Sequence, residues 1–303
     1  MNIIETRNLS HRYWRTEALR DLTLTVPTGS VFALLGANGA GKTTLIKVLM
    51  NLLRPSAGVA QVLGVNSCRL GELEFAQIGY VSENQQLPLW MTVRQLLDFC
   101  RPLYPTWDRD LEAKLLAQFD LPPERKLKQL SRGMLMKAAL LSSLAYRPRL
   151  LVLDEPFSGL DPLVRDEFTQ GLLETSRLGD WTVFISSHDI EEVERLADHV
   201  ALLENGSLRF TETTEGLLSR FRRIEVETAG PVAGDDLPAH WLSWRSEAGR
   251  ATFVESSYDA VATEQICRER FPEATVRAHP MTLREIFIAL ARAKSASPKA
   301  SAA

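Results

Sequence analysis

Hydrophobic residues in the first 35 positions follow the patterns of short β-strands. Leu22, Leu24 and Val26 alternate with threonines, as in a strand that buries only one face. Residues 31–35 form a continuous apolar run, VFALL, which suits a strand that is buried on both faces. Residues 43–53 then have helical spacing and end before a proline. The segment therefore predicts a buried strand that leads through a short loop into a helix.

Between residues 91 and 203 the pattern first becomes helical and then alternates. The sequence Thr92-Val-Arg-Gln95 is a capping box, which opens a helix, and a further helix is expected at 131–145. Strands and helices then follow one another regularly, which is typical of a parallel sheet covered by helices. The predicted order is a strand at 150–153, a helix at 162–178, a strand at 182–186, a helix at 189–197 and a strand at 200–203.

The pattern changes again after residue 219. Short strands are expected near 224–228, 241–245, 251–254 and 275–278, with helices near 260–270 and after the capping sequence Thr282-Leu-Arg-Glu285. We therefore expect a large domain at 1–219, which contains a helical subdomain at about 86–145. A small C-terminal α/β accessory domain is expected at 220–293, and a disordered tail at 294–303.

Composition and charge narrow the classes of function. Of the 303 residues, 45% are hydrophobic and 24% are charged, with a formal net charge of −3. This balance gives no general attraction to nucleic acid or anionic lipid, so we expect no nucleic-acid partner. No run approaches the roughly 20 apolar residues that span a bilayer, so any contact with a membrane is expected to go through a partner. Cys68, Cys100 and Cys267 have neither metal-site nor disulfide spacing, which favours a reducing cytosol.

The loop after the buried strand carries a phosphate-binding pattern. Its glycines let the backbone curl so that successive N–H groups face a polyphosphate, and the N-terminus of the following helix favours an anion. Lys42 can reach the β- and γ-phosphates of a nucleotide, and the Thr43 hydroxyl can hold Mg²⁺. A chance match in a glycine-rich turn is disfavoured by the strand before the loop and the helix after it. The residues expected to contact nucleotide here are Gly36, Asn38, Gly39, Gly41, Lys42, Thr43 and Thr44.

Two carboxylates follow the apolar run 150–153. That strand delivers Asp154 and Glu155 to the carboxyl end of the sheet, where open α/β sheets bind their ligands. Asp154 would support Mg²⁺, and Glu155 is the candidate general base that polarises the attacking water. Carboxylates at a strand end often only face solvent, but beside a phosphate-binding loop they complete a nucleotide site.

Three further motifs stand at fixed spacings from these residues. Leu130-Ser-Arg-Gly-Met places Ser131 23 residues before Asp154, and Ser158-Gly-Leu-Asp lies just after Glu155, with His188 33 residues beyond it. Together with the phosphate-binding loop, the motifs resemble the signature motif, D-loop and switch histidine of ABC ATPases, over about residues 1–220. The motifs stand in the order and at the spacing expected of that family, so the resemblance is highly specific.

The resemblance implies both a fold and an activity. The fold class is α/β: a P-loop NTPase with a RecA-like core, an antiparallel β subdomain and a helical signature subdomain, followed by the small C-terminal α/β domain. The activity is ATP hydrolysis with ATP and Mg²⁺, coupled to transport in an ABC transporter.

The resemblance also implies a site shared by two chains. Ser131 and Gly133, at the start of a helix, would address the phosphate of the ATP held by the opposing subunit. His188 would contact the γ-phosphate and help to position the water, and Asp161 would lie at the subunit interface. Hydrolysis would then need a homodimer or heterodimer of ATPase subunits, arranged head to tail.

Two positions leave alternatives open. Tyr13 occupies the place of the family's adenine-stacking aromatic residue, but the adjacent Trp14 could be the stacking ring instead. Glu83 stands where the family has a glutamine that binds Mg²⁺ and senses the membrane partner. A carboxylate can also serve Mg²⁺, so either Glu83 substitutes for that glutamine, or Gln85 or Gln86 does so.

The resemblance implies an integral membrane permease subunit as partner, which would hold the chain at the cytoplasmic face of the cell membrane. Met134 and Lys137 in the signature helix, and the C-terminal domain, resemble bacterial exporters of the multidrug and antibiotic type. The apolar stretch 87–91, which includes Trp90, is either part of the groove that receives a helix of the permease or packs inside the helical subdomain.

The sequence disfavours two other classes of function. A non-transport ABC ATPase acting on DNA or ribosomes would carry long coiled coils or two ATPase domains in tandem, and this chain has neither pattern. A regulatory module that binds nucleotide without hydrolysis is disfavoured by the presence of Lys42, Asp154, Glu155 and His188.

Overall fold

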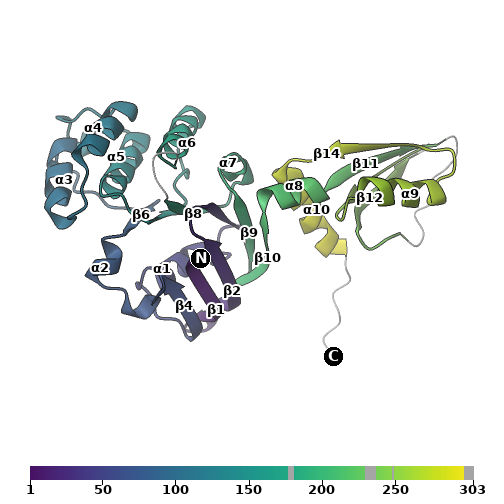
Figure 1. Cartoon of the computed structure of the whole chain (residues 1–303), viewed down its shortest axis with the longest axis horizontal. Coiled ribbons are helices and arrows are strands. Elements are labelled where there is room, and N and C mark those ends of the chain that lie inside the picture. Colours follow the sequence, from purple (N-terminus) through teal and green to yellow (C-terminus); the bar gives the residue numbers. More distant parts are fainter. Residues whose placement is uncertain (177–180, 229–236, 248, 297–303) are drawn as a thin grey trace. The chain divides into compact units, whose positions relative to one another are not determined.

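The computed structural model describes residues 1–176, 181–228, 237–247 and 249–296 (Figure 1). Its contacts divide the chain into two compact units, Met1–Thr211 and Glu212–Ala303. The division falls within strand β10 (Ser207–Thr213), before the boundary expected at 219. Of the tail expected at 294–303, residues 297–303 lie outside the described residues, and the last helix continues to Ala296.

Six strands form the central sheet of the first unit. Neighbouring strands from β9 to β6 run parallel. The continuous apolar runs of β3, β7 and β8 are almost completely buried, as expected for central strands covered on both faces. Their carboxyl ends meet at one edge of the sheet. The strand order is β10, β9 (His199–Glu204), β3 (Val31–Leu35), β8 (Thr182–Ser187), β7 (Leu150–Asp154) and β6 (Ile78–Ser82).

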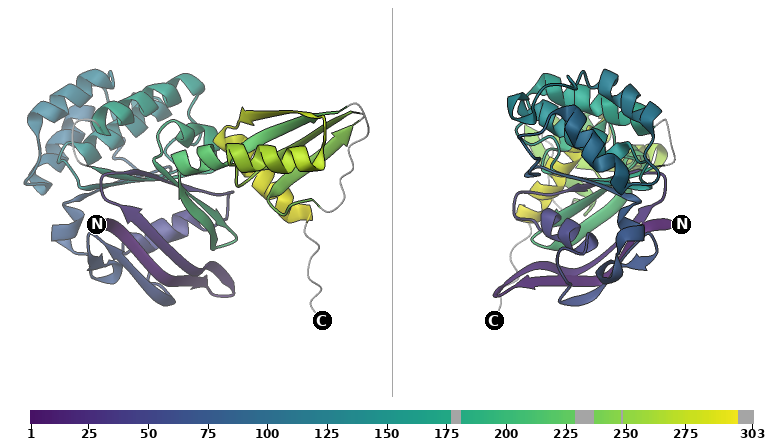
Figure 2. Two further views of the ribbon diagram at one scale, coloured as in Figure 1. Left: turned by 45° about the vertical axis from the view of Figure 1, so that its right-hand side comes forward. Right: turned by 90° about the vertical axis from the view of Figure 1, so that its left-hand side faces the viewer.

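A second sheet and a group of helices lie on opposite sides of these strands (Figures 1 and 2). The second sheet is antiparallel, in the order β2 (Thr16–Pro27), β1 (Asn2–Tyr13), β4 (Ala57–Val62) and β5 (Val65–Asn66). One hydrophobic cluster joins both sheets with helix α1 (Lys42–Leu49). The helical group consists of α3 (Val93–Cys100), α4 (Arg109–Gln118) and α5 (Arg132–Leu144). The other α-helices in the described part of this unit are α2 (Glu72–Phe75), α6 (Pro162–Ser176) and α7 (Ile190–Glu194).

Two helices of the first unit are shorter than the sequence predicts. Helix α1 ends at Leu49 instead of residue 53, because Asn51 takes a left-handed conformation (φ 57°) and the Leu52 N–H donates to the Lys47 carbonyl at 2.8 Å. This bond pattern is a Schellman-type end, which asparagine tolerates well. Helix α7 is also shorter than the predicted 189–197. The capping box at Thr92 is confirmed, since its hydroxyl accepts the Gln95 N–H.

The second unit is built on a four-stranded antiparallel sheet. Its order is β12 (Trp241–Glu247), β13 (Arg250–Glu255), β11 (Arg222–Glu227) and β14 (Thr275–Pro280). A hydrophobic cluster joins the sheet with α9 (Ala260–Arg270), and the rings of Trp241 and Phe253 stack with centroids 4.0 Å apart. Helices α8 (Thr214–Arg220) and α10 (Leu283–Ala296) complete the unit. The sequence also predicts an apolar face on α10 at Leu283, Ile286, Phe287 and Leu290; the first three are buried and Leu290 is half-buried.

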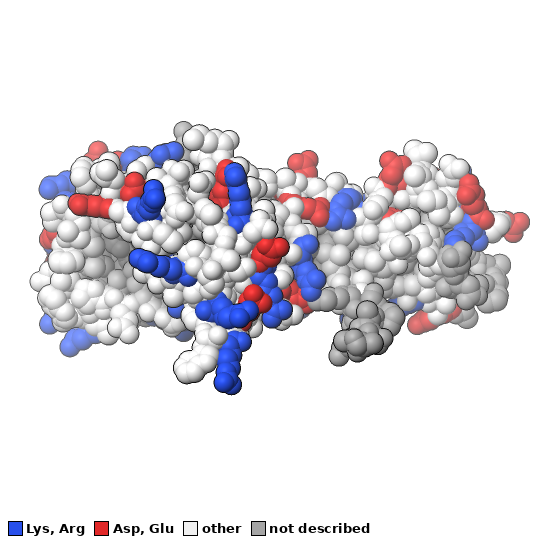
Figure 3. Space-filling view, turned by 90° about the horizontal axis from the view of Figure 1, so that it is seen from below, with Lys and Arg blue, Asp and Glu red and all other residues white. Residues whose placement is uncertain are grey.

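Two further observations concern membrane-spanning helices and the distribution of surface charge. Among the described residues, no helix combines the length and apolar character needed to cross a lipid bilayer. On the face seen in Figure 3, the described basic and acidic side chains are interspersed between neutral ones.

Candidate active site

The phosphate-binding loop connects β3 with α1 at the carboxyl edge of the central sheet. The backbone of Gly41 has a φ of 111°, which residues with a Cβ rarely adopt. A Cβ added at Gly36 would lie 2.4 Å from the Leu203 carbonyl oxygen, and one added at Gly41 would lie 2.6 Å from that of Ala18. The loop therefore needs glycine both for its curvature and for the close approach of its neighbours.

Lys42 lies beneath this loop with its ammonium group fully engaged. The side chain is 5% exposed, and Nζ donates to the Gly36 carbonyl at 2.5 Å and to the Ala37 carbonyl at 3.2 Å. Nζ also lies 2.9 Å from Glu155 Oε1. A buried ammonium requires such partners, because an isolated charge in a low-dielectric interior is costly. By contrast, Asn38 and Thr43 are exposed, so the outer side of the loop is open to a ligand.

Asp154 ends β7 next to the loop and is held by two hydroxyl groups. Its Oδ1 accepts a hydrogen bond from Thr43 Oγ1 at 3.2 Å and another from Ser186 Oγ at 2.7 Å. Burial raises the pKa of Asp154 from its ordinary value, against the lowering effect of these hydrogen bonds. A hydroxyl and a carboxylate are ligands that Mg²⁺ accepts, so Thr43 and Asp154 fit a divalent cation.

Glu155 bridges the loop and the end of β8. Its backbone is left-handed (φ 52°), and its N–H donates to Ser186 Oγ at 3.0 Å. Its two carboxylate oxygens face different partners, because Oε1 lies against Lys42 and Oε2 lies 2.7 Å from His188 Nδ1. The structure thus brings Lys42, Glu155 and His188 into one chain of contacts, with the Thr43–Asp154 pair beside it.

Ser186 belongs to this site but was not predicted to. It pairs in register with Asp154 across the parallel strands β7 and β8, and its hydroxyl contacts both Asp154 and the Glu155 N–H. The sequence held a signal for it, because parallel neighbours align their carboxyl ends, and the predicted strand 182–186 ends at this serine.

Residues Leu130–Met134, which we call the signature segment, lead into α5 in the helical group. Ser131 is the N-cap, and its hydroxyl accepts the Met134 N–H at 3.2 Å. Gly133 packs tightly against α6, since an added Cβ would lie 2.4 Å from Val164 Cγ1. Asp161 stands before α6 and accepts the Val164 N–H at 3.1 Å. The capping contacts of Ser131 and Asp161 are therefore local. Neither contact joins these residues to the chain of contacts formed by Lys42, Glu155 and His188.

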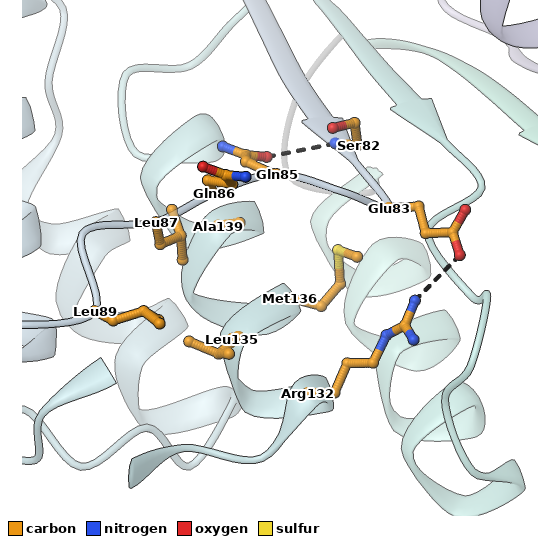
Figure 4. Close-up of a pocket in the computed structure, with 10 residues that line it drawn as sticks. All are labelled: Ser82, Glu83, Gln85, Gln86, Leu87, Leu89, Arg132, Leu135, Met136 and Ala139. Atoms are coloured by element: carbon orange, nitrogen blue, oxygen red, sulfur yellow. Dashed lines mark hydrogen bonds and ion pairs between the residues drawn. The ribbon is translucent and has the colours of Figure 1, made fainter. Parts of the chain in front are cut away.

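Glu83 lies between the Asp154 strand and the signature segment. Its N–H donates to the Asp154 carbonyl at 2.9 Å, which continues the pairing of β6 with β7. Its carboxylate Oε1 accepts hydrogen bonds from Ser158 Oγ at 2.7 Å and from Arg132 Nη2 at 3.2 Å. Figure 4 shows the carboxylate turned toward Arg132, whereas Gln85 lies at the other end of the segment, where it accepts the Ser82 N–H.

A cavity of about 430 Å³ opens between residues 82–89 and helix α5. Five of its ten lining residues are apolar and five are polar or charged (Figure 4). Trp90 is 69% exposed and Leu89 is 49% exposed, so packing of Trp90 inside the helical subdomain, one of the two predicted alternatives, is wrong. The lining residues are Ser82, Glu83, Gln85, Gln86, Leu87, Leu89, Arg132, Leu135, Met136 and Ala139.

Two aromatic side chains stand at the end of β1. Tyr13 is 43% exposed and Trp14 is 89% exposed, so neither is a core residue. Tyr13 makes an edge contact with the His11 ring, with centroids 4.6 Å apart. The strand that follows them reaches the phosphate-binding loop, because the Ala18 carbonyl lies against Gly41.

The chain is similar to known proteins both in sequence and in fold. Residues 19–158 match the family described as ABC transporter. The bacitracin transport ATP-binding protein of Enterococcus faecalis is 31% identical over 208 residues, which cover 68% of each chain. The sulfate/thiosulfate import ATP-binding protein of Yersinia pestis is 33% identical over 221 residues, or 70% of this chain and 61% of that protein. A solved ATP-binding subunit of an ABC transporter is 28% identical, with a TM-score of 0.65 over 72% of this chain and 92% of that one.

Proposed function

Since this chain belongs to the ABC transporter family of ATP-binding proteins, we propose that two ATPase chains close head to tail around two ATP molecules. The family hydrolyses ATP, and the chain is the ATP-binding subunit of an ABC transporter. The contact chain from Lys42 through Glu155 to His188, beside the Thr43–Asp154 pair, supports the hydrolytic chemistry of each site. The sharing of the site between two chains rests on Ser131 and Gly133 at the N-terminus of α5.

The phosphates of ATP bind to the loop 36–43. Backbone N–H groups and the N-terminus of α1 address the phosphate oxygens. Lys42 turns from Glu155 toward the β- and γ-phosphates, a short movement because its ammonium already lies at the loop. Gly36, Gly39 and Gly41 keep the backbone free of side chains there. One of the exposed rings, Tyr13 or Trp14, stacks on the adenine.

Thr43 and Asp154 would hold Mg²⁺ beside these phosphates, with a third oxygen from Glu83 or from the amides of Gln85 or Gln86. When bound, Mg²⁺ neutralises charge on the phosphates and helps to align them. The Ser186 hydroxyl keeps the Asp154 carboxylate in place.

Glu155 acts as the base once Lys42 has turned to the phosphates. A carboxylate oxygen accepts a proton from water while the water oxygen bonds to the γ-phosphorus and the bond to the β–γ bridging oxygen breaks. ADP and inorganic phosphate result. His188, 2.7 Å from Glu155 Oε2, contacts the γ-phosphate and orients the attacking water.

The second chain supplies Ser131 and Gly133 to the same ATP. Both residues lie at the N-terminus of α5, where free N–H groups and the helix dipole favour a phosphate. Asp161 lies at the subunit interface. Each chain therefore completes the site of the other.

The partner is an integral membrane permease, which places the chain at the cytoplasmic face of the membrane. The cavity beside Glu83 and the exposed Trp90 form a surface suited to a short helix of that permease. A relative named for bacitracin transport and one named for sulfate/thiosulfate import have similar identity to this chain. The proposed direction, export, therefore rests on the resemblance of the signature helix and C-terminal domain.

Mixing two inactive variants tests the shared site. Lys42→Ala destroys the phosphate-binding loop but leaves the signature segment intact, and Ser131→Arg does the reverse. Each variant alone should hydrolyse no ATP, whereas their mixture forms dimers with one intact site and regains phosphate release. A mixture as inactive as its components, although each variant is folded and dimerises, would contradict the proposal. Lys42→Ala mixed with Lys42→Ala/Ser131→Arg is the matched control and should stay inactive.

A further inference from the structure

One carboxylate oxygen connects three motifs of the first unit. Glu83 Oε1 accepts hydrogen bonds from Ser158 at 2.7 Å and from Arg132 at 3.2 Å. Arg132 is the first residue of α5, directly between Ser131 and Gly133, and Ser158 lies in the loop after β7. We refer to Arg132, Glu83 and Ser158 as the Glu83 cluster.

The loop after β7 is shaped to receive the arginine. Gly159 has a positive φ (68°), and a Cβ added there would lie 2.5 Å from Arg132 Nη1 and 2.8 Å from its Cζ. The guanidinium group therefore rests directly on the backbone of Gly159 while one of its nitrogens bonds to Glu83. An arginine can make both contacts because its planar group presents several donors at once.

A carboxylate in this position has two possible uses. As a ligand of Mg²⁺ it would turn toward Asp154 and Thr43. Its oxygen Oε1 instead receives donors from Ser158 and Arg132, and Figure 4 shows the side chain directed at Arg132. The arginine charge also compensates a negative charge that would otherwise stand near the γ-phosphate.

We infer that Glu83 is a positioning residue: through Arg132 and Ser158 it fixes the N-terminus of α5, with Ser131 and Gly133, relative to the loop after β7 of the same chain. The inference rests on the proposed function, because its consequence is felt at the ATP of the opposing chain. The bonds to Arg132 and Ser158 hold the Glu83 carboxylate in place of the metal-binding role expected for this position.

A double-mutant cycle tests the cluster. The variants are Glu83→Ala, Arg132→Ala and the double variant, each measured for ATP turnover as a function of ATP and Mg²⁺. Because Arg132 is about half exposed (52%), each single change should lower kcat by about two- to fivefold, the effect of an exposed ion pair. The double variant should be no slower than either single one, since both changes remove the same contact. KM for ATP and the Mg²⁺ concentration at half-maximal rate should stay unchanged.

Arg94 and Glu124 provide a matched control. They form an exposed ion pair of 2.6 Å in the helical group, outside the nucleotide motifs. Arg94→Ala and Glu124→Ala should leave turnover at the wild-type value. This comparison separates the loss of the Glu83 cluster from the general loss of a surface ion pair.

Two outcomes would overturn the inference. If Glu83→Ala alone raises the Mg²⁺ requirement while Arg132→Ala does not, Glu83 is a metal ligand. If the two effects multiply in the double variant, the residues act independently. Failure of the mixed Lys42→Ala and Ser131→Arg variants to regain activity would instead contradict the shared site, whatever the cycle shows.

Discussion

Gly133 leaves no room for a side chain where α5 meets α6. An added Cβ would lie 2.4 Å from Val164 Cγ1, whereas ordinary contacts begin at 3.4 Å. Val164 is β-branched and has one strongly preferred rotamer in a helix, so in Gly133→Ala we expect the start of α5 to move away from α6 by about 1 Å. Ser131, the N-cap of the same helix, would move with it.

The displacement predicts a large loss of activity. A misplacement of 1 Å in a group that contacts the reacting phosphate can cost about 10²-fold in rate. This factor corresponds to about 2.7 kcal/mol in the activation barrier. Overpacking should also lower the free energy of unfolding by about 1–3 kcal/mol. We therefore expect Gly133→Ala to bind ATP with unchanged affinity and to hydrolyse it roughly 100-fold more slowly.

Phosphate release measured beside nucleotide binding checks this expectation. The second variant, Gly133→Ala/Val164→Ala, removes the methyl group that causes the clash and should recover at least about tenfold in turnover, because the helix can return to its place. Gly171→Ala is the matched control. Its Cβ would lie 2.5 Å from Phe119, so it should cost stability but much less turnover.

Two results would refute this reasoning. Turnover of Gly133→Ala within threefold of wild type would mean that the helix start need not be held in place. A Gly133→Ala/Val164→Ala protein as slow as Gly133→Ala would mean that glycine is required for the approach of the phosphate itself and not for packing on α6.

Three further predictions concern the nucleotide site. Lys42→Ala removes the ammonium 2.9 Å from Glu155 and should weaken ATP binding and abolish turnover; unchanged phosphate release would contradict the assignment. Asp154→Asn should be inactive yet melt at a higher temperature than wild type at neutral pH, because burial raises the pKa of Asp154 and so penalises its charged form in the folded state. Because the pKa of Asp154 is higher in the folded than in the unfolded state, the wild type loses stability as the pH rises between these two values. The difference in melting temperature between Asp154→Asn and wild type should therefore shrink as the pH falls through the raised pKa. A difference that does not depend on pH would argue against burial of the charge as the cause. Tyr13→Ala should lower the affinity for ATP in a binding titration while Trp14→Ala should not, and the reverse result would assign the stacking role to Trp14.

Local patterns in the sequence predicted most of the central elements. The apolar run 150–153 becomes the buried strand β7, and the loop 36–43 lies between a strand and a helix as its glycines require. Asp154 and Glu155 reach the carboxyl edge of the sheet because that strand is central and parallel to its neighbours. These features depend on residues close together in the chain or on strand order within a parallel sheet.

Other features depend on contacts between distant segments. The pairing of Glu83 with Arg132 joins residues 49 positions apart, and Ser158 lies 75 positions from Glu83. Periodicity carries no information about such contacts, so the sequence left the role of Glu83 open between metal binding and replacement by Gln85 or Gln86. The early end of α1 depends on a single left-handed residue, Asn51, which helical spacing does not register.

The exposure of the apolar stretch 87–91 also depends on contacts between distant segments. Trp90 could pack in the helical group or remain on the surface, and both are compatible with its neighbours in the sequence. In the structure the Trp90 side chain is 69% exposed and lies on the surface of the unit.

The central claim, a site completed by a second ATPase chain, is tested most directly, for two copies of this chain, by light scattering of Glu155→Gln. The variant lacks the base but retains Lys42 and the phosphate-binding loop, so it should bind ATP without hydrolysis and remain closed. With Mg-ATP the measured mass should double from that of one chain, 33.9 kDa, and Glu155→Gln/Ser131→Arg should prevent the doubling. A Glu155→Gln protein that binds ATP and keeps the mass of a single chain would contradict the claim.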